Sequence, residues 1–244
     1  DASLLLQVRV RNCVDEAEYH MLRHQWDCIN RPQYVRRTWS PLQEEALGAV
    51  AFFVALDDEE AKRQHKRCLF VSGGPGSGKS AVLLEVAVRS AKRGNRVLIV
   101  CPTGQLVHSF KSQLPEVDGI ENVQVDTIHG VLRYKRQGPD EKVQWAPPSA
   151  LRRIDLILVD EASQYDNKEW QRFAQSVAEQ PHLPYVVAVA EFQQLQPVVS
   201  GGLCQKMVSG WPRVELDTVY RTSDVDQLLF LNRIRERQPS RQAP

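Results

Sequence analysis

The segment GGPGSGKS, residues 73–80, fits the pattern G-x-x-x-x-G-K-[S/T] and narrows the possible folds more than any other feature of the chain. An apolar run, 68–73, leads into it and a helical pattern, 79–92, follows, which is the strand–loop–helix setting that the pattern requires. Glycines let successive backbone N–H groups turn inward, and the next helix points its positive dipole end at the same place. The segment predicts a phosphate site; the alternative is a glycine-rich turn that binds nothing.

The residue types in this loop predict separate roles. The lysine would reach the β- and γ-phosphates of a nucleoside triphosphate, and the hydroxyl of the serine after it would be a ligand of Mg²⁺. ATP and Mg²⁺ are therefore the expected cofactors. The predicted nucleotide-binding residues are Gly74, Gly76, Ser77, Gly78, Lys79 and Ser80, of which Lys79 is also a predicted catalytic residue.

Short runs rich in Val, Ile and Leu alternate with helical patterns over most of the chain. Strands that are buried on both faces and separated by helices predict an α/β fold with a parallel sheet. The predicted strands are 68–73, 96–102, 122–126, 154–160 and 184–190, and the predicted helices include 42–64, 79–92 and 168–179.

A pair of carboxylates follows the fourth of these strands, in the segment LILVDEAS. Asp160 would stand at the carboxyl end of the strand, where open α/β sheets bind ligands, and would hold Mg²⁺ through water. Glu161, one residue on, can accept a proton from an attacking water. Taken alone the pair could be a solvated helix cap, but beside the phosphate loop it predicts a hydrolytic site.

The last predicted strand runs into AVAEFQQLQPV, residues 188–198, which contains three glutamines within four residues. Glutamine offers amide donors and an acceptor without charge, so it suits contact with a phosphate or a water. This strand would end beside the γ-phosphate, and we expect Gln194 to sense that group and to signal it to the rest of the protein. The alternative is an ordinary polar loop.

Composition excludes several classes of protein. The 244 residues carry a net charge of +1, so a nucleic-acid site would have to be a local patch or a groove that reads the backbone. The five scattered cysteines favour free thiols in a reducing, intracellular compartment over a disulfide framework. No apolar run approaches the ~20 residues of a membrane span, so we expect no membrane contact. The sequence does not begin with Met, and we expect it to be a piece of a longer chain.

In order, the segments GGPGSGKS, CPTGQ, DTIHG, VDEASQ, EFQQLQPV and VYRTSD resemble the motif series of superfamily-one DNA helicases. The chain is most similar to the Pif/RecD-like branch, which moves 5′ to 3′, and the resemblance covers about residues 40–237. It implies a RecA-like P-loop NTPase domain, with a mostly parallel sheet flanked by helices, followed by the start of a second RecA-like domain. It also implies single-stranded DNA as the partner.

The resemblance assigns further roles. Thr103 and Gly104 in CPTGQ, and Thr127 and His129 in TIHG, match motifs that contact the single strand. For His129 the alternative is a histidine that caps a helix. Arg221 matches the family's arginine finger, which would reach the γ-phosphate from the second domain; the alternative is a surface arginine.

The chain departs from the family pattern at three places. Ala190 and Glu191 stand where the family usually has Gly-Asp, which predicts a modest shift in geometry. Gln43 is the one nearby candidate for the family's adenine-reading glutamine, so base preference is expected to be weak. The later motifs, including a second phosphate-contacting arginine, are absent from these 244 residues.

These observations predict an extension at 1–38, a first RecA-like domain at 39–212 and the beginning of a second at 213–244. The predicted function is ATP-dependent 5′ to 3′ DNA unwinding, and this chain by itself is expected to bind ATP weakly without unwinding DNA. One alternative is a module, or a mobile-element remnant, that binds ATP and a single strand only. Another is an RNA helicase of the same superfamily. Family analogy places such a protein in the nucleus or the mitochondrion.

Overall fold

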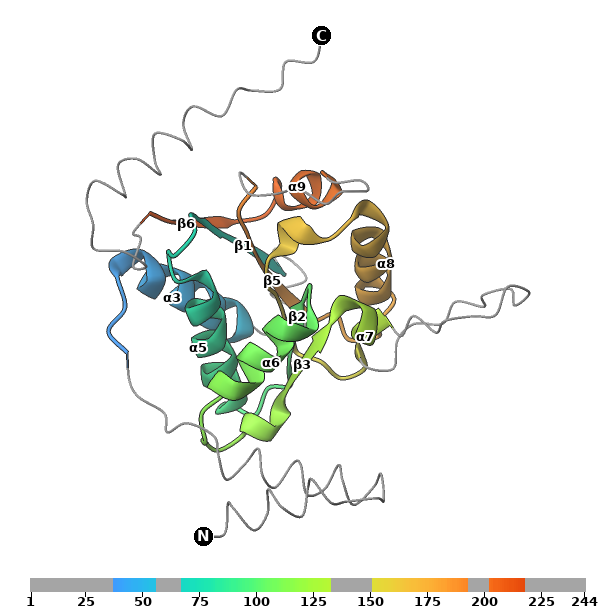
Figure 1. Cartoon of the computed structure of the whole chain (residues 1–244). Helices are drawn as coiled ribbons and strands as arrows, with labels where there is room; N and C mark the ends of the chain where they lie inside the picture. The colour runs from blue at the N-terminus through green and yellow to red at the C-terminus, as the bar shows by residue number, and fades with distance from the viewer. Residues whose placement is uncertain (1–36, 56–66, 133–150, 193–201, 218–244) are drawn as a thin grey trace.

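The computed structural model describes residues 37–55, 67–132, 151–192 and 202–217 (Figure 1). They build a six-stranded sheet in the order β3-β2-β4-β5-β1-β6, and every neighbouring pair is parallel. The strands are β1 (Cys68–Gly73), β2 (Val97–Cys101), β3 (Val123–Thr127), β4 (Leu156–Val159), β5 (Tyr185–Ala190) and β6 (Arg213–Leu216). The predicted parallel α/β fold is confirmed, and each of the five predicted strands is present.

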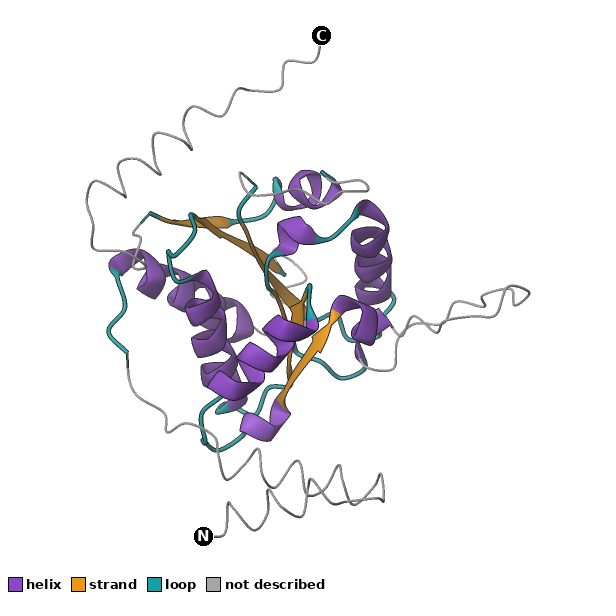
Figure 2. Ribbon diagram, viewed as in Figure 1, coloured by secondary structure: helices purple, strands orange, loops and turns teal. Residues whose placement is uncertain are grey.

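Helices cover both faces of this sheet (Figure 2). The α-helices are α3 (Pro41–Ala55), α5 (Lys79–Ala91), α6 (Gly104–Gln113), α7 (Ile128–Leu132), α8 (Asn167–Ala178) and α9 (Leu203–Val208). Two short 3₁₀ turns, η1 (Ile120–Asn122) and η3 (Ala162–Gln164), complete the described elements. Of the predicted helix 42–64, the part after residue 55 lies outside the described residues. No helix in the described segments is long and apolar enough to cross a bilayer.

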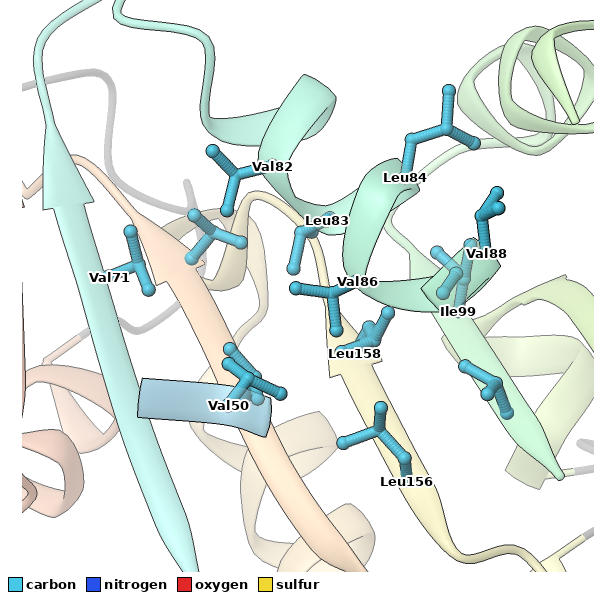
Figure 3. Close-up of a cluster of buried hydrophobic side chains, with 14 of the residues drawn as sticks. Val50, Val71, Val82, Leu83, Leu84, Val86, Val88, Ile99, Leu156 and Leu158 are labelled. Atoms are coloured by element: carbon cyan, nitrogen blue, oxygen red, sulfur yellow. The ribbon is translucent and has the colours of Figure 1, made fainter. Parts of the chain in front are cut away.

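Alternation along the strands sorts the core into two halves, because successive side chains of a strand point to opposite faces. Ile99 and Leu158 face α3, α5 and α6, whereas Leu98, Val100 and Ile157 face α7, α8 and α9. Figure 3 shows the first half, in which Val82, Leu83 and Val86 of α5 lie over Val71, Ile99 and Leu158 of three strands. Burial on both faces explains why the strands read as continuous apolar runs.

The start of α3 is fixed by its first residues. The Gln43 N–H donates to Ser40 Oγ at 3.3 Å, and Gln43 Oε1 accepts from the Ser40 N–H at 3.1 Å. This reciprocal pair satisfies N–H groups that a helix N-terminus leaves without intrahelical partners, and Pro41 suits the first helical position because it has no N–H to satisfy. The helix therefore begins at a defined residue beside the phosphate loop.

The structure corrects the expected domain boundary at residue 213. Arg213–Leu216 form β6, which pairs in parallel with β1, from Phe70↔Arg213 to Gly73↔Leu216. Val214 and Leu216 are buried in the half of the core that α3, α5 and α6 cover, and the Arg213 side chain donates to Ser72 Oγ at 3.0 Å. The segment thus belongs to the first sheet, and the rest of the expected second domain, 218–244, lies outside the described residues, as does the extension 1–36.

Replacing Leu158 by Ala tests the core. Its side chain is fully buried in the centre of the sheet, so we expect the free energy of unfolding to fall by about 2–5 kcal/mol. Leu183→Ala is the matched control, because that leucine is 42% exposed and its loss should cost no more than about 0.5 kcal/mol. Urea unfolding of both variants measures this, and equal losses would contradict the assignment of the core.

Candidate functional site

The predicted site residues gather at one edge of the sheet because the strands are parallel. The phosphate loop follows β1, Thr103 follows β2, Thr127 ends β3, Asp160 follows β4 and Glu191 follows β5. Carboxyl ends of parallel strands meet at the same edge, so segments far apart in the sequence come within reach of each other.

The phosphate loop has the tight geometry that its glycines predict. Gly78 has φ 85° and precedes the first residue of α5, so the backbone turns through the left-handed region where the helix begins. A Cβ on Gly73 would lie 2.6 Å from Ser77 Oγ and 2.8 Å from the Leu216 carbonyl oxygen, which leaves room for no other residue type. The loop is closed by the Ser77 N–H, which donates to the Gly74 carbonyl oxygen at 3.2 Å.

Lys79 lies inside this loop. Its side chain is buried, and Nζ donates to the carbonyl oxygens of Gly73 at 2.7 Å and of Gly74 at 3.0 Å. A buried ammonium needs such acceptors, because an unsatisfied charge away from water is costly. The contacts place the one cationic group of the loop where phosphate oxygens would enter.

Asp160 and Ser80 come together across the sheet edge. The Ser80 hydroxyl lies 3.3 Å from Asp160 Oδ1 and 3.5 Å from Oδ2, and the carboxylate is 1% exposed. Burial raises the pKa of Asp160 from 3.8 to about 7, the negative charge of Glu161 adds to the rise, and the Ser80 hydrogen bond and Lys79 oppose it.

This pair fits Mg²⁺. The ion prefers oxygen ligands and binds proteins through one or two carboxylates while keeping several waters. Asp160 and Ser80 supply a carboxylate and a hydroxyl side by side, and a cation there would offset the cost of keeping the buried carboxylate ionised. Asp160 and Ser80 are therefore the residues that would hold the metal, and metal binding by them stays a prediction.

Glu161 has an unusual backbone. Its φ of 46° and ψ of 46° lie in the left-handed region, which costs roughly 1–2 kcal/mol for a residue with a side chain. Its Oε2 is buried and has no hydrogen-bond partner among the described residues. A strained carboxylate beside the Ser80–Asp160 pair, with one oxygen unused by the described residues, has the placement expected of a group that acts on a ligand.

Two aromatic residues that no sequence motif singles out hold the turn after β4 in place. The Tyr165 hydroxyl lies 3.2 Å from the carbonyl oxygens of both Val100 and Asp160, and Trp170 Nε1 donates to the Ala162 carbonyl oxygen at 2.9 Å. Their rings pack edge to face at 6.1 Å between centroids. They position the segment that carries Asp160; only a structure shows this, because aromatic residues after a DE pair have many possible roles.

Gln43 is bound to the phosphate loop. It is 5% exposed, and its Nε2 donates to the Ser77 carbonyl oxygen at 3.2 Å while Oε1 caps α3. Both ends of the amide therefore have partners in the protein. The structure places this residue, which was expected to lie near adenine, where it joins the start of α3 to the loop.

The residues expected to contact a single strand lie at the ends of adjacent strands. Cys101 of β2 pairs with Thr127 of β3, and Thr103 and Gly104 follow at the exposed start of α6. Thr103 Oγ1 accepts from the Leu106 N–H at 3.3 Å, and Thr127 Oγ1 accepts from the Gly130 N–H at 3.0 Å. The two hydroxyls thus cap local turns; their contact with nucleic acid stays a prediction.

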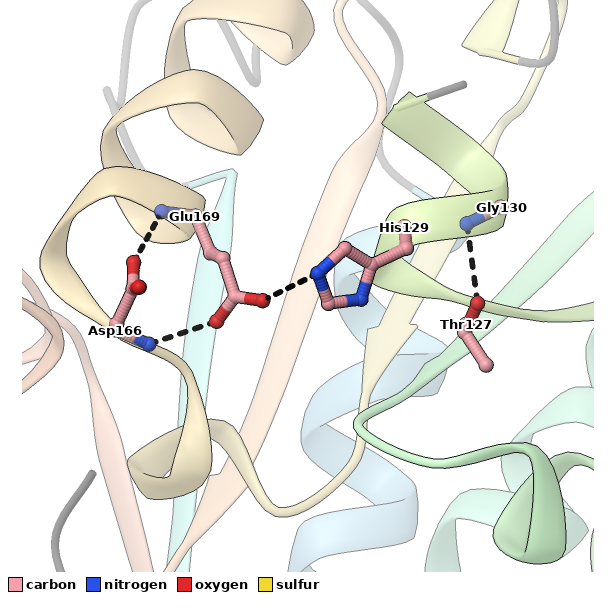
Figure 4. A network of polar contacts seen from close by, with 5 residues as sticks. All are labelled: Thr127, His129, Gly130, Asp166 and Glu169. Atoms are coloured by element: carbon pink, nitrogen blue, oxygen red, sulfur yellow. Dashed lines mark hydrogen bonds and ion pairs between the residues drawn. The ribbon is translucent and has the colours of Figure 1, made fainter. Parts of the chain in front are cut away.

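His129 joins this region to α8, as Figure 4 shows. Its Nε2 lies 3.2 Å from Glu169 Oε1, and Glu169 Oε2 accepts from the Asp166 N–H at 2.8 Å in the capping box that starts α8. The histidine side chain is still 60% exposed. His129 therefore contacts the capping box of a neighbouring helix, and its contact with nucleic acid stays a prediction.

The segment that follows β5 is described only as far as Phe192. Ala190 is fully buried, Glu191 is 5% exposed, and Phe192 packs against Phe70 at 5.5 Å between ring centroids. Gln194 and Arg221, the predicted γ-phosphate sensor and arginine finger, lie outside the described residues.

The fold and this site define a P-loop nucleotide-binding α/β protein. The chain belongs to the family described as AAA domain, whose pattern matches residues 59–243. It is 30% identical over 156 residues to the ATP-dependent RecD2 DNA helicase of Deinococcus radiodurans, covering 64% of this chain and 20% of that protein. It is 23% identical to the RecBCD enzyme subunit RecD of Buchnera aphidicola subsp. Schizaphis graminum, covering 58% of this chain and 25% of that subunit.

Solved structures show the same fold. The Pif1 helicase of Candida albicans superposes with a TM-score of 0.59 at 19% identity, covering 82% of this chain and 44% of that one. A structure of two coordinating Pif1 helicases at forked dsDNA gives 0.58 at 17% identity, covering 84% and 50%. The resemblance to the Pif/RecD-like branch and the RecA-like fold are confirmed. The chain spans only a fifth to a quarter of the length of the curated relatives named here.

The pKa of Asp160 gives a test of the site without nucleotide or metal. The folded protein holds this proton between about pH 4 and pH 7, where the unfolded chain has lost it, so stability falls as pH rises through that window. The loss is on the order of 1 kcal/mol per pH unit and ends above about pH 7. Asp160→Asn cannot ionise. The variant's stability advantage, measured by urea unfolding in EDTA, should therefore grow up to about pH 7 and then level off. A difference independent of pH would contradict the raised pKa.

Proposed function

We propose that this chain contributes the first motor domain of an ATP-dependent DNA helicase that moves 5′ to 3′ on single-stranded DNA. The observation that carries the proposal is the contact of Ser80 with the buried Asp160, beside a loop that holds Lys79. The same sheet edge carries Thr103 and Thr127, so the nucleotide residues and the expected strand contacts share one surface.

Each residue has a step in this proposal. Backbone N–H groups of Gly76 and Gly78 hold the phosphate chain of ATP, joined by the Ser77 N–H when it leaves the Gly74 carbonyl oxygen. Lys79 likewise exchanges its loop carbonyls for the β- and γ-phosphate oxygens. Ser80 and Asp160 would hold Mg²⁺, which would supply positive charge to neutralise the phosphates. Glu161 orients the attacking water and accepts its proton through the carboxylate oxygen that the described protein leaves unpaired.

The nucleic-acid part of the proposal rests on the likeness to helicases and on the exposed strand ends. Thr103, Gly104, Thr127 and His129 contact the backbone of a single strand through hydroxyl, N–H and imidazole groups, which suits a chain with almost no net charge. Gln194 reports the γ-phosphate and Arg221 completes the site from a second domain, as the family resemblance implies. Alternate closing and opening of two domains would then move the strand.

ATP hydrolysis tests the nucleotide site. In the complete protein, Lys79→Ala and Glu161→Gln should each lower ATP turnover stimulated by single-stranded DNA at least about 100-fold, because one removes a phosphate contact and the other the proton acceptor. Lys206→Gln is the control, since that lysine is exposed on α9 and loses the same charge. Equal rates in parent, variants and control would refute the assignment. Stimulation by DNA compared with RNA of equal length decides between the two nucleic acids.

His129 tests the strand surface. Removing one hydrogen-bonding group should weaken binding to fluorescein-labelled oligothymidylate about two- to ten-fold in His129→Ala. His108→Ala is the matched control, because His108 is also exposed, on the adjacent α6, and no part of the prediction involves it. If both variants bind as the parent does, or if both lose affinity equally, the placement of the strand at His129 is wrong.

A further inference from the structure

A cavity lies at the amino edge of the sheet, opposite the candidate site, where β2, β4 and β5 begin. Arg96 directly precedes β2, Asp155 directly precedes β4, and His182 stands three residues before β5. The cavity measures about 690 Å³, which is within the usual range for pockets that take a small organic ligand. The side chains important to it are Arg96, Arg152, Arg153, Asp155 and His182, and we refer to it as the arginine pocket.

The three guanidinium groups of the arginine pocket are free to bind a ligand. Arg96, Arg152 and Arg153 are exposed, and within the described part of the chain none of their side chains has an ion-pair or hydrogen-bond partner. Positively charged arginine side chains that share a cavity repel one another, so their grouping favours an anionic ligand.

Among the described residues that line the pocket, Asp155 is the one carboxylate, and it does not neutralise the arginines. Asp155 Oδ2 accepts from the Arg96 backbone N–H at 2.8 Å, and Asp155 Oδ1 lies 3.5 Å from His182 Nε2. Backbone hydrogen bonds fix the same segments, since the Asp155 N–H donates to the Arg96 carbonyl oxygen at 2.9 Å and the Tyr185 N–H donates to the Asp155 carbonyl oxygen at 2.9 Å. Asp155 therefore ties three strand starts together, and it gives the guanidiniums no ion-pair partner within the described segments.

The segment LRRI, residues 151–154, directs two arginines outward. Leu151 and Ile154 are buried in the second half of the core and anchor the turn on both sides, while Arg152 and Arg153 are exposed between them. Arg153 has φ 64°, a left-handed conformation that arginine has no local hydrogen bond to favour. A strained cationic residue at a cavity is the kind of outlier that accompanies ligand contacts.

We propose that the arginine pocket binds phosphate groups of a nucleic-acid strand, at a site separate from the strand contacts at Thr103 and Thr127. Guanidinium forks bind phosphate oxygens in pairs, and successive phosphates of a strand can engage several arginines, whereas one carboxylate offers two oxygens. The choice of nucleic acid as the phosphate source rests on the proposed function; the anion site itself does not. The nucleic-acid segment bound here would differ from the segment at Thr103 and Thr127, because the two sites lie at opposite ends of the β-strands.

Salt dependence of DNA binding tests the proposal. Binding of labelled oligothymidylate is measured over a range of NaCl concentrations for the parent, Arg96→Gln, Arg152→Gln and the double variant. Each arginine that contacts a phosphate should reduce the slope of log K against log salt by about 0.7 and weaken binding about ten-fold at low salt. Arg152→Lys keeps the charge but loses the fork, so it should keep the slope and bind more weakly than the parent.

Controls separate this site from the nucleotide site. Lys206→Gln removes one exposed positive charge elsewhere and should keep the parental slope. ATP turnover without DNA should be unchanged in the arginine variants. An error in the nucleotide assignment would appear as unchanged ATP turnover in Lys79→Ala, whereas an error in the pocket proposal would appear as an unchanged salt slope in the arginine variants. Thermal unfolding verifies the fold, which these unpaired side chains do not support.

Three results would overturn the proposal. One is a double variant whose DNA-binding slope equals that of the parent. The second is arginine-dependent binding of inorganic pyrophosphate with no change in DNA binding, which would assign the pocket to a free phosphate compound. The third is arginine-dependent binding of polyglutamate alone, which would assign it to an acidic protein segment. A reduced slope in both single variants, larger in the double variant, supports a strand site.

Discussion

The contact between Ser80 and Asp160 joins segments 80 positions apart, and the nucleotide site depends on it. Neither residue can bring it about locally. β1 delivers the phosphate loop, β4 delivers Asp160, and β5 lies between them in the sheet, so register on both sides of β5 sets the separation. Because all the pairs are parallel, every strand contributes its carboxyl end to the same edge. The apolar runs that bury the sheet on two faces are therefore also what places a hydroxyl beside a carboxylate.

That arrangement is unfavourable for the folded protein by itself, and the surrounding residues show how it is held. A buried carboxylate with a raised pKa lies next to a strained glutamate, and both destabilise the chain in the absence of a cation. Tyr165 and Trp170 fix the backbone of this turn, and Gln43 fixes the phosphate loop from the other side. Groups held rigidly before a ligand binds need little reorganisation afterwards, which is the property that phosphoryl-transfer sites use.

The strands and the phosphate loop could be predicted from the sequence because their signals are local. Leu156–Val159 is an uninterrupted apolar run, and the glycines of 73–78 lie between a strand and a helix. β6 was missed as part of this sheet, since its four residues alternate between exposed and buried and the motif order suggested a new domain there. The links from Gln43 to Ser77 and from His129 to Glu169 join residues 34 and 40 positions apart, so no pattern within a single segment predicts them.

The two edges of the sheet hold different sets of charged groups. The carboxyl edge holds Asp160, Glu161 and Glu191 with Lys79, whereas the amino edge holds Arg96, Arg152 and Arg153 with Asp155. A strand such as β2, with five residues at about 3.3 Å each, separates them by roughly 15 Å. Accordingly, the groups that shift the pKa of Asp160 are its neighbours Glu161, Ser80 and Lys79, and no arginine is among them. The raised pKa of Asp160 is therefore set at the carboxyl edge itself, by burial and by the groups that follow β1 and β4.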